Sequence, residues 1–278
     1  MSRDSGVVIL HSAGISGRGR AELAQVLATP RRFFKPTDVA ETLDVDADTA
    51  AKKLARWAEA GWVRRVRRGL YIVVPVYVTN PAACSEDALL VAAEIWSPCY
   101  FTGWTAARQW ALTEQVFRTT VLKTSGRVRT SSVRLLDHDY IVNHVSDDAL
   151  TWGLKTEWRD DTRLRFADPA RTVVDILDAP RLGGGIRHGA EILVAYLDEQ
   201  DPAQLIEYGD RLGNRAVFKR LGYLIETLDL HRPSLVSACR ERASSGVSAL
   251  EPDGPHGGRR CTRWGLRVNV SVVREGAS

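Results

Sequence analysis

The sequence has few cysteines, and none of the four lies near another. Cys84, Cys99, Cys239 and Cys261 form no Cys-x-x-Cys pair within the 278 residues. Zinc ribbons and redox dithiols depend on such close pairs, so the spacing supports neither. We therefore expect reduced, buried thiols in a cytoplasmic protein.

Long hydrophobic runs are also missing. The longest apolar stretches, such as residues 70–74, are far too short to cross a bilayer, so we expect no membrane partner. Residues 7–10 form a short apolar run with no cleavage pattern after it, and we expect no signal peptide. With 44% hydrophobic and 26% charged residues, the composition excludes wholesale disorder, collagen and coiled coil. The length suits one large or two modest domains.

The first third of the chain has few acidic residues relative to its basic residues. Residues 1–80 carry 13 basic and 8 acidic side chains, whereas residues 81–278 carry 25 and 26. A positive excess confined to one region indicates a polyanionic partner for that region.

Three helices are predicted in this basic region. The first covers about residues 19–28, and the second begins at Pro36, since proline fits the first helical turn. Asp46 can cap a third helix that ends before Gly61. The second and third helices are separated by a short polar break. This arrangement predicts a helix-turn-helix whose last helix can enter a major groove.

A β-hairpin is predicted directly after the third helix. Residues 62–75 contain two β-prone runs around a turn that ends at Gly69, with four arginines within five residues. An isolated hairpin of this kind can be a charged edge that deters aggregation, and an isolated basic helix can be a solvated face. Together they predict a winged helix-turn-helix domain, residues 1–80, that binds double-stranded DNA. The predicted DNA-binding residues are Thr49, Lys52, Lys53, Arg56, Arg64, Arg65, Arg67 and Arg68.

Residues 81–278 are predicted to form a larger mixed domain, which makes the fold class α+β. Helices are expected over residues 85–96 and 102–112. An antiparallel sheet is expected from residues 116–123, 132–136, 140–144, 153–158 and 164–167. Four helices should follow, at residues 168–177 (with Asp168 as cap), 186–197, 202–212 and 215–228. Residues 244–258 are expected to be mobile, and residues 263–272 to form a final strand.

Candidate enzymatic motifs are weak. In Asp137-His138-Asp139 the two carboxylates would share one face of a strand while the histidine points away, which favours a polar strand end over a metal site. Gly183-Gly184-Gly185 lacks the strand and lysine of a P-loop, so a flexible connector is the expected role. Asp175 is expected to pair with Arg171, one helical turn earlier. We predict no catalytic residue, metal or cofactor. Two alternatives remain, a metal-dependent nuclease or nucleotidyl-handling enzyme, and a regulator that senses a small molecule.

Five motifs, in order, resemble the AbiE-type antitoxin family (AbiEi, the antitoxin of a type IV toxin–antitoxin system). They are Val66–Tyr71, Thr102–Ala107, Asp168–Asp175, Lys219–Glu226 and Arg263–Asn269, spread over most of residues 36–270. The chain departs from the family pattern at Lys35, where a Ser or Thr commonly precedes the proline.

The resemblance implies two activities. The winged helix would bind inverted repeats in the protein's own promoter and repress it, and two copies could occupy a palindromic site. The larger domain, residues 81–278, would counteract a nucleotidyltransferase toxin. In such systems antitoxin and toxin are described as acting without a stable complex, so no toxin-binding surface is implied.

Overall fold

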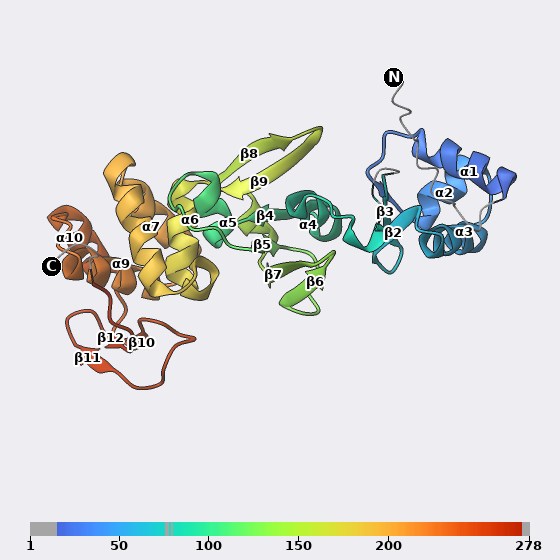
Figure 1. Ribbon diagram of the computed structural model, residues 1–278. Helices are drawn as coiled ribbons and strands as arrows, with labels where there is room; N and C mark the ends of the chain where they lie inside the picture. The colour runs from blue at the N-terminus through green and yellow to red at the C-terminus, as the bar shows by residue number, and fades with distance from the viewer. Residues whose placement is uncertain (1–15, 76–77, 79, 274–278) are drawn as a thin grey trace, which may run out of the picture. The chain divides into compact units, whose positions relative to one another are not determined.

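The computed structural model describes residues 16–75, 78 and 80–273. The chain divides into two compact units. The N-terminal unit comprises Met1–Asp87 with Leu135–Asp137, and the C-terminal unit comprises Ala88–Arg134 and His138–Ser278. Sequence patterning suggested a boundary after residue 80, and the contacts place it after Asp87. Both units contain helices and sheets, so the fold is α+β (Figure 1).

The described residues of the N-terminal unit form three helices and a small antiparallel sheet. The helices are α1 (Gly17–Leu27), α2 (Pro36–Leu43) and α3 (Ala47–Glu59). The sheet has the order β1-β3-β2, from β1 (Phe33–Phe34), β2 (Val63–Arg67) and β3 (Leu70–Val73), and a 3-10 turn, η1 (Pro81–Ala83), follows it. One hydrophobic core joins the helices to the sheet, with Leu23, Val39, Leu54, Trp57 and Tyr71 among its members.

Local capping explains where these helices begin. The Asp46 side chain accepts a hydrogen bond from the Thr49 amide at 2.8 Å, as predicted for the start of α3. At α2 the residue before the proline is Lys35, whose side chain is no acceptor. There the Asp38 carboxylate instead accepts from the Lys35 amide at 2.8 Å. The departure from the family pattern at Lys35 thus coexists with a capped helix.

The C-terminal unit is built on a six-stranded sheet of order β6-β7-β5-β4-β9-β8. Its strands are β4 (Cys99–Phe101), β5 (Thr119–Thr124), β6 (Ser132–Leu135), β7 (His138–His144), β8 (Leu154–Arg159) and β9 (Thr162–Ala167). The prediction of an antiparallel sheet is wrong, because β5 pairs with β7 in parallel and β4 pairs with β9 in parallel. Helix α4 (Ala88–Trp96) precedes the central strand β4 in the chain, and helix α5 (Gly103–Gln109) follows it.

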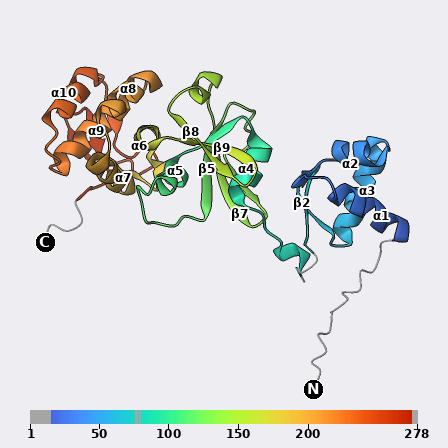
Figure 2. The ribbon, with the colours of Figure 1, turned by 90° about the horizontal axis from the view of Figure 1, so that it is seen from above.

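A block of helices follows the sheet (Figures 1 and 2). It comprises α6 (Pro169–Asp178), α7 (Ile186–Glu199), α8 (Ala203–Leu212), α9 (Ala216–Thr227) and α10 (Pro233–Arg242). A short 3-10 turn, η3 (Pro180–Gly183), joins α6 to α7, and another, η2 (Asp147–Leu150), lies between β7 and β8 of the sheet. The predicted cap of α6 is confirmed, since the Asp168 side chain accepts from the Arg171 amide at 2.8 Å. Helix α10 was not predicted; it buries only Leu235 and Cys239, too few for a visible apolar stripe.

The last part of the chain forms a second, three-stranded sheet of order β10-β12-β11. Its strands are β10 (Ser248–Ala249), β11 (Arg259–Cys261) and β12 (Leu266–Val268), in place of the single strand expected over residues 263–272. Part of residues 244–258, which were expected to be mobile, makes specific contacts with the helices. Leu250 is fully buried, and the Arg220 guanidinium donates to the Ala249 and Leu250 carbonyls at 3.0 and 3.1 Å.

Burial also determines the chemistry of the cysteines. Cys84, Cys99 and Cys239 are buried free thiols, and Cys261 is partly buried. Burial raises the pKa of Cys99 to about 11 and that of Cys239 to about 12, so both remain protonated at neutral pH. Within the described residues, no helix combines the length and the hydropathy needed to cross a bilayer.

Candidate nucleic-acid interface

Helix α3 presents one buried and one exposed face. Ala50, Leu54 and Trp57 pack into the core of the N-terminal unit, and helical periodicity then turns Lys52 and Arg56 outward. Between α2 and α3 the chain reverses through Asp44, whose φ of 51° lies in the left-handed region. The turn between the two helices is therefore only three residues long, Asp44–Asp46, as the sequence predicted.

The four predicted residues of α3 have different roles. The Thr49 hydroxyl donates to the Asp46 carboxylate at 2.7 Å and thereby lowers its pKa, so Thr49 is engaged in capping. Lys52 is exposed and pairs with Asp48 at 2.6 Å, one turn earlier on the same face. Lys53 points elsewhere: its ammonium binds Glu22 of α1 and lowers the pKa of that carboxyl. Arg56 is exposed and has no ion-pair partner among the described residues.

The arginines of the hairpin differ in their contacts and exposure. The Arg64 guanidinium is half-buried and donates to the Cys84 carbonyl, which fixes the hairpin to the following segment. The register between β2 and β3 shifts between Arg65 and Arg67, so both Val63 and Val66 can face the core although they are three residues apart. Arg65 and Arg67 are left exposed, and Arg65 Nε donates to the Arg67 carbonyl at 3.3 Å.

The tip of the hairpin is a two-residue turn. Arg67 pairs with Leu70, which leaves Arg68 and Gly69 to reverse the chain, and Gly69 has the predicted positive φ of 75°. Nothing lies within 4 Å of the position that a Cβ on Gly69 would take, so the tip projects into open space.

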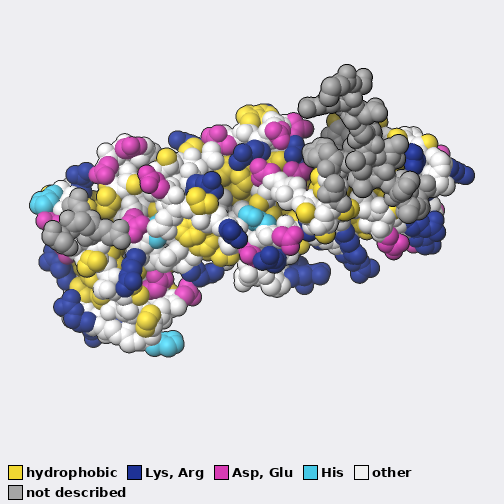
Figure 3. Space-filling model, in the orientation of Figure 1, with side chains coloured by type: hydrophobic (Ala, Val, Ile, Leu, Met, Phe, Trp, Pro, Cys, Tyr) yellow, Lys and Arg dark blue, Asp and Glu magenta, His cyan; other side chains and the backbone are white. Residues whose placement is uncertain are grey.

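Five of the eight predicted residues therefore present exposed cationic groups within the N-terminal unit. We refer to this set as the basic surface: Lys52, Arg56, Arg65, Arg67 and Arg68. Figure 3 shows Lys and Arg side chains gathered over α3 and near the β2–β3 hairpin on one face of this unit. Sequence reasoning missed the Glu22 partner of Lys53, because the two residues are 31 positions apart and no local pattern connects them.

A second arrangement of charged residues is buried in the C-terminal unit. The Asp175 carboxylate accepts from Arg171 Nε and from Lys123 Nζ, each at 3.0 Å, and from the Thr102 hydroxyl at 2.7 Å. Burial opposes ionisation of Asp175, but the charges of Lys123 and Arg171 outweigh it and lower its pKa. The Arg171–Asp175 pair was predicted from helical spacing, whereas Lys123 was missed because it comes from β5.

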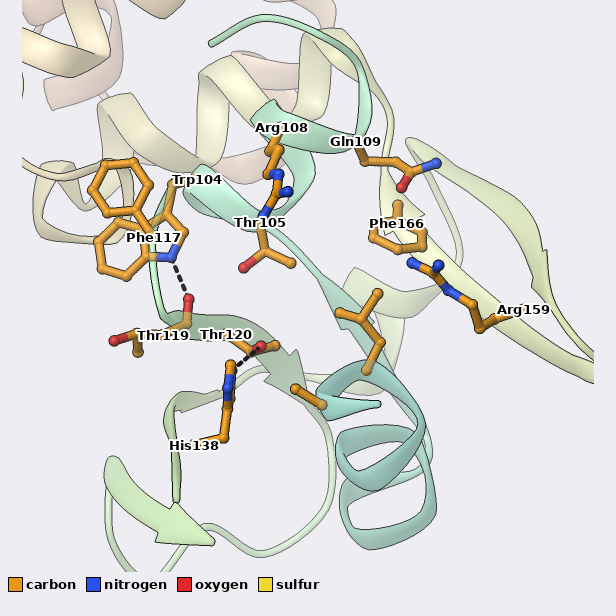
Figure 4. Close-up of a pocket in the computed structure, with 12 residues that line it drawn as sticks. Trp104, Thr105, Arg108, Gln109, Phe117, Thr119, Thr120, His138, Arg159 and Phe166 are labelled. Carbon is orange, nitrogen blue, oxygen red and sulfur yellow. Dashed lines mark hydrogen bonds between the residues drawn. The ribbon is translucent and has the colours of Figure 1, made fainter. Parts of the chain in front are cut away.

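A cavity of about 340 Å³ lies beside α5 in the same unit (Figure 4). Trp104 stacks on Phe117 with ring centroids 4.6 Å apart, and the Trp104 indole donates to the Thr119 carbonyl at 2.6 Å. Figure 4 shows Arg108 entering from α5 and Arg159 from β8. Among the described residues that line this cavity none is Asp or Glu, so it has no carboxylate for metal binding or acid–base chemistry.

The weak enzymatic motifs take up structural positions. Leu136 and Asp137 form the two-residue turn between β6 and β7, with φ of 48° and 64°. Asp137 therefore does not share a strand face with Asp139, which pairs with Arg134 at 3.4 Å. The neighbouring His138 Nε2 lies 3.0 Å from the Thr120 hydroxyl. No group of three or more His, Cys, Asp or Glu side chains is placed to hold a metal ion in the described part of the chain.

At the triglycine segment, a side chain of the protein itself takes the place that a phosphate ligand would need. Gly184 and Gly185 have φ of 84° and 95°, and the Ile186 amide at the start of α7 donates to the Glu251 carboxylate. The Glu251 carboxylate thus takes the position that a phosphate would need at the start of α7. The triglycine segment, which was expected to be a flexible connector, forms a turn next to this hydrogen bond.

Comparison with known proteins gives a likeness of fold. No protein-family model matches the chain, and no curated protein matches it. Among solved structures, the chain is similar to the crystal structure of the Rv2827c protein from Mycobacterium tuberculosis, with a TM-score of 0.63 and 14% identity over 91% of this chain and 92% of that one. At this identity the likeness shows the fold alone: this chain shares its overall α+β architecture with the Rv2827c protein.

Proposed function

We propose that the protein is a DNA-binding transcriptional repressor and antitoxin of the AbiE type. In this proposal the N-terminal unit is a winged helix-turn-helix, with α2 and α3 as the helix pair and β2–β3 as the wing. It binds inverted repeats in the protein's own promoter. The C-terminal unit counteracts a nucleotidyltransferase toxin without forming a stable complex with it.

The observation that carries the DNA-binding proposal is the basic surface. Arg56 on α3 and Arg65, Arg67 and Arg68 on the hairpin are exposed, and the hairpin follows α3 after only a short turn. An exposed helix beside a basic hairpin suits a duplex, since the helix fits a major groove and arginines bind phosphates or a narrow minor groove. One such unit reads few base pairs, which favours two copies on a palindrome.

Binding to the upstream promoter duplex should weaken strongly as salt is added. If four phosphates are neutralised, a fourfold rise in salt lowers affinity about 100-fold or more, because bound counterions are released on association. Fluorescence anisotropy with a labelled duplex over a range of KCl concentrations measures this slope. Salt-insensitive binding, or no binding, would contradict the proposal, and metal-dependent cleavage of the duplex would favour the nuclease alternative.

The double variant Arg67→Ala/Arg68→Ala should lower the affinity and reduce the salt slope by about two. The matched control is Arg127→Ala/Arg129→Ala, which removes the same charge from exposed positions of the C-terminal unit. Equal losses in both variants would mean that only net charge matters. An unchanged affinity in the first variant would mean that the hairpin does not contact DNA.

The antitoxin role is supported by the ordered motifs that resemble the AbiE-type family. If a nucleotidyltransferase is encoded beside this protein, co-expression should restore growth that the nucleotidyltransferase alone prevents. The Arg67→Ala/Arg68→Ala variant should still restore growth when both proteins are expressed from unrelated promoters. Failure of the unmodified protein to restore growth would contradict the antitoxin role and leave DNA binding to its own test.

A further inference from the structure

A cavity of about 350 Å³ in the C-terminal unit lies among β5, β7, η2, α6 and α8. Four of its lining side chains are cationic, and two are carboxylates, Asp148 and Asp178. The cationic side chains are Lys123, Arg171, Arg181 and Arg211. The cavity differs from the one beside α5, and none of its lining residues belongs to the basic surface.

Two side chains that line this cavity each carry a buried hydrogen-bond donor that lacks a partner among the described residues. The two donors are Arg171 Nη1 and Asn143 Nδ2. The orientation of the Asn143 amide is set by Arg181, whose Nη2 donates to Asn143 Oδ1 at 3.0 Å, so the other amide atom must be the donor. Buried donors are nearly always satisfied, so these two donors call for an acceptor, which a water molecule or a bound anion can supply.

The other nitrogens of the Arg171 guanidinium are engaged, which leaves Nη1 as its free donor. Nε donates to Asp175 at 3.0 Å, and Nη2 donates to the Tyr100 hydroxyl at 3.1 Å. The guanidinium also lies over the Trp152 ring, 3.2 Å from its centroid. Arg171 is fully buried, so it cannot turn to solvent to satisfy Nη1.

The charge of the buried cluster points to an anion. Lys123 and Arg171 share the single carboxylate of Asp175, and the three residues are at most 5% exposed. Within the cluster one positive charge therefore has no carboxylate of its own, and the other carboxylates at this cavity are Asp148 and Asp178. Arg181 and Arg211 add positive charge at the cavity, although Arg181 is also 3.6 Å from Asp253.

We propose that this cavity binds a phosphate-type oxyanion, either inorganic phosphate or the phosphoryl group of a small metabolite. Arg171 Nη1 and Asn143 Nδ2 are the inner donors, and Arg181 and Arg211 flank the ligand. A tetrahedral anion with several acceptor oxygens can take hydrogen bonds from all these groups at once, which a planar carboxylate does less well. The volume is near the lower end of ordinary ligand pockets and suits a small molecule.

Calorimetric titration of the full-length protein with inorganic phosphate, and separately with ribose 5-phosphate, tests the proposal at constant ionic strength in chloride. Saturable binding of either ligand, with a rise in the unfolding temperature above that given by chloride, is expected. Tighter binding of ribose 5-phosphate would identify the phosphoryl group of a metabolite as the ligand. Tighter binding of phosphate would identify the free ion. No saturable binding of either would overturn the proposal.

The variant Asn143→Asp locates the site. Aspartate can still accept from Arg181, but it replaces the inner donor with a negative charge, so phosphate affinity should fall tenfold or more. Arg211→Gln should also weaken binding, and it provides a second test if Asn143→Asp does not fold. Arg127→Gln removes one exposed charge outside the cavity and is the control. Arg67→Ala/Arg68→Ala should bind phosphate normally; a loss in that variant alone would place the anion on the basic surface and overturn the proposal.

Discussion

Replacing Asp175 with asparagine is expected to lower the free energy of unfolding by about 3–5 kcal/mol, the usual cost of breaking a buried ion pair on one side. The substitution leaves Lys123 and Arg171 buried with no opposing carboxylate, and it removes an acceptor of the Thr102 hydroxyl. Urea unfolding followed by circular dichroism measures the change. Since the folded-state pKa of Asp175 is lowered, its contribution is present at neutral pH and is lost as pH falls through that pKa.

Two controls separate the charge from the general effect of a substitution. Asp198→Asn removes a carboxylate from an exposed position of α7 and should change stability by less than about 0.5 kcal/mol. The double variant Lys123→Met/Asp175→Asn removes one cation together with the anion, so it should recover part of the loss. A loss in Asp175→Asn no larger than in Asp198→Asn would show that the cluster contributes little to stability.

Replacing Gly222 with alanine is expected to destabilise the C-terminal unit by about 3 kcal/mol, the upper part of the usual range for overpacking. Gly222 lies in α9 directly against the buried Trp264, and an added Cβ would overlap the indole ring. Helix propensity alone would favour alanine by about 1 kcal/mol, so the steric effect has the opposite sign and decides the outcome. Thermal unfolding and tryptophan fluorescence report the loss and the displacement of Trp264.

Gly17→Ala is the matched control for this substitution. Gly17 is also helical, in α1, and nothing lies within 4 Å of the position of its added Cβ. This variant should be neutral or slightly stabilising. Trp264→Leu should make room for the methyl group, so the double variant Gly222→Ala/Trp264→Leu should lose less than the sum of the single losses. Equal stability of Gly222→Ala and the unmodified protein would mean that α9 and the terminal sheet can separate at little cost.

Helix starts were predicted well because their signals are local. The side chains of Asp46 and Asp168 each accept from an amide three residues later, as the sequence predicted. Asp201 and Asn214 likewise accept from an amide two residues later at the starts of α8 and α9. The pairing of strands was not predicted. The sheet is mixed because the hairpin between β6 and β7 returns β7 to the side of β5 in a parallel direction, and this choice depends on contacts across the fold. Strand β4 was missed because it has only three residues.

For the candidate site, too, local features could be predicted from the sequence and long-range contacts could not. Exposure of Arg56, Arg67 and Arg68 follows from helical period and from the position of Gly69, both of which are local. The engagement of Lys53 with Glu22 and of Arg64 with Cys84 depends on residues far away in the sequence. The cavity around Arg171 could not be found from the sequence, since its wall combines β5, β7, α6 and α8.

The contacts of residues 249–251 have a consequence for synthesis of the protein. Glu251 completes the first turn of α7, and Arg220 of α9 donates to Ala249, Leu250 and the end of α6. These partners emerge from the ribosome only after every helix of the block has been made. The helices can therefore reach their final hydrogen bonding only after residue 251 has been synthesised, whereas the described strands of the N-terminal unit, β1 to β3, are already made once residue 73 has been added. A nascent chain stalled before residue 249 would contain the described helices and strands of the N-terminal unit, but its C-terminal unit would lack the contacts that complete the helical block.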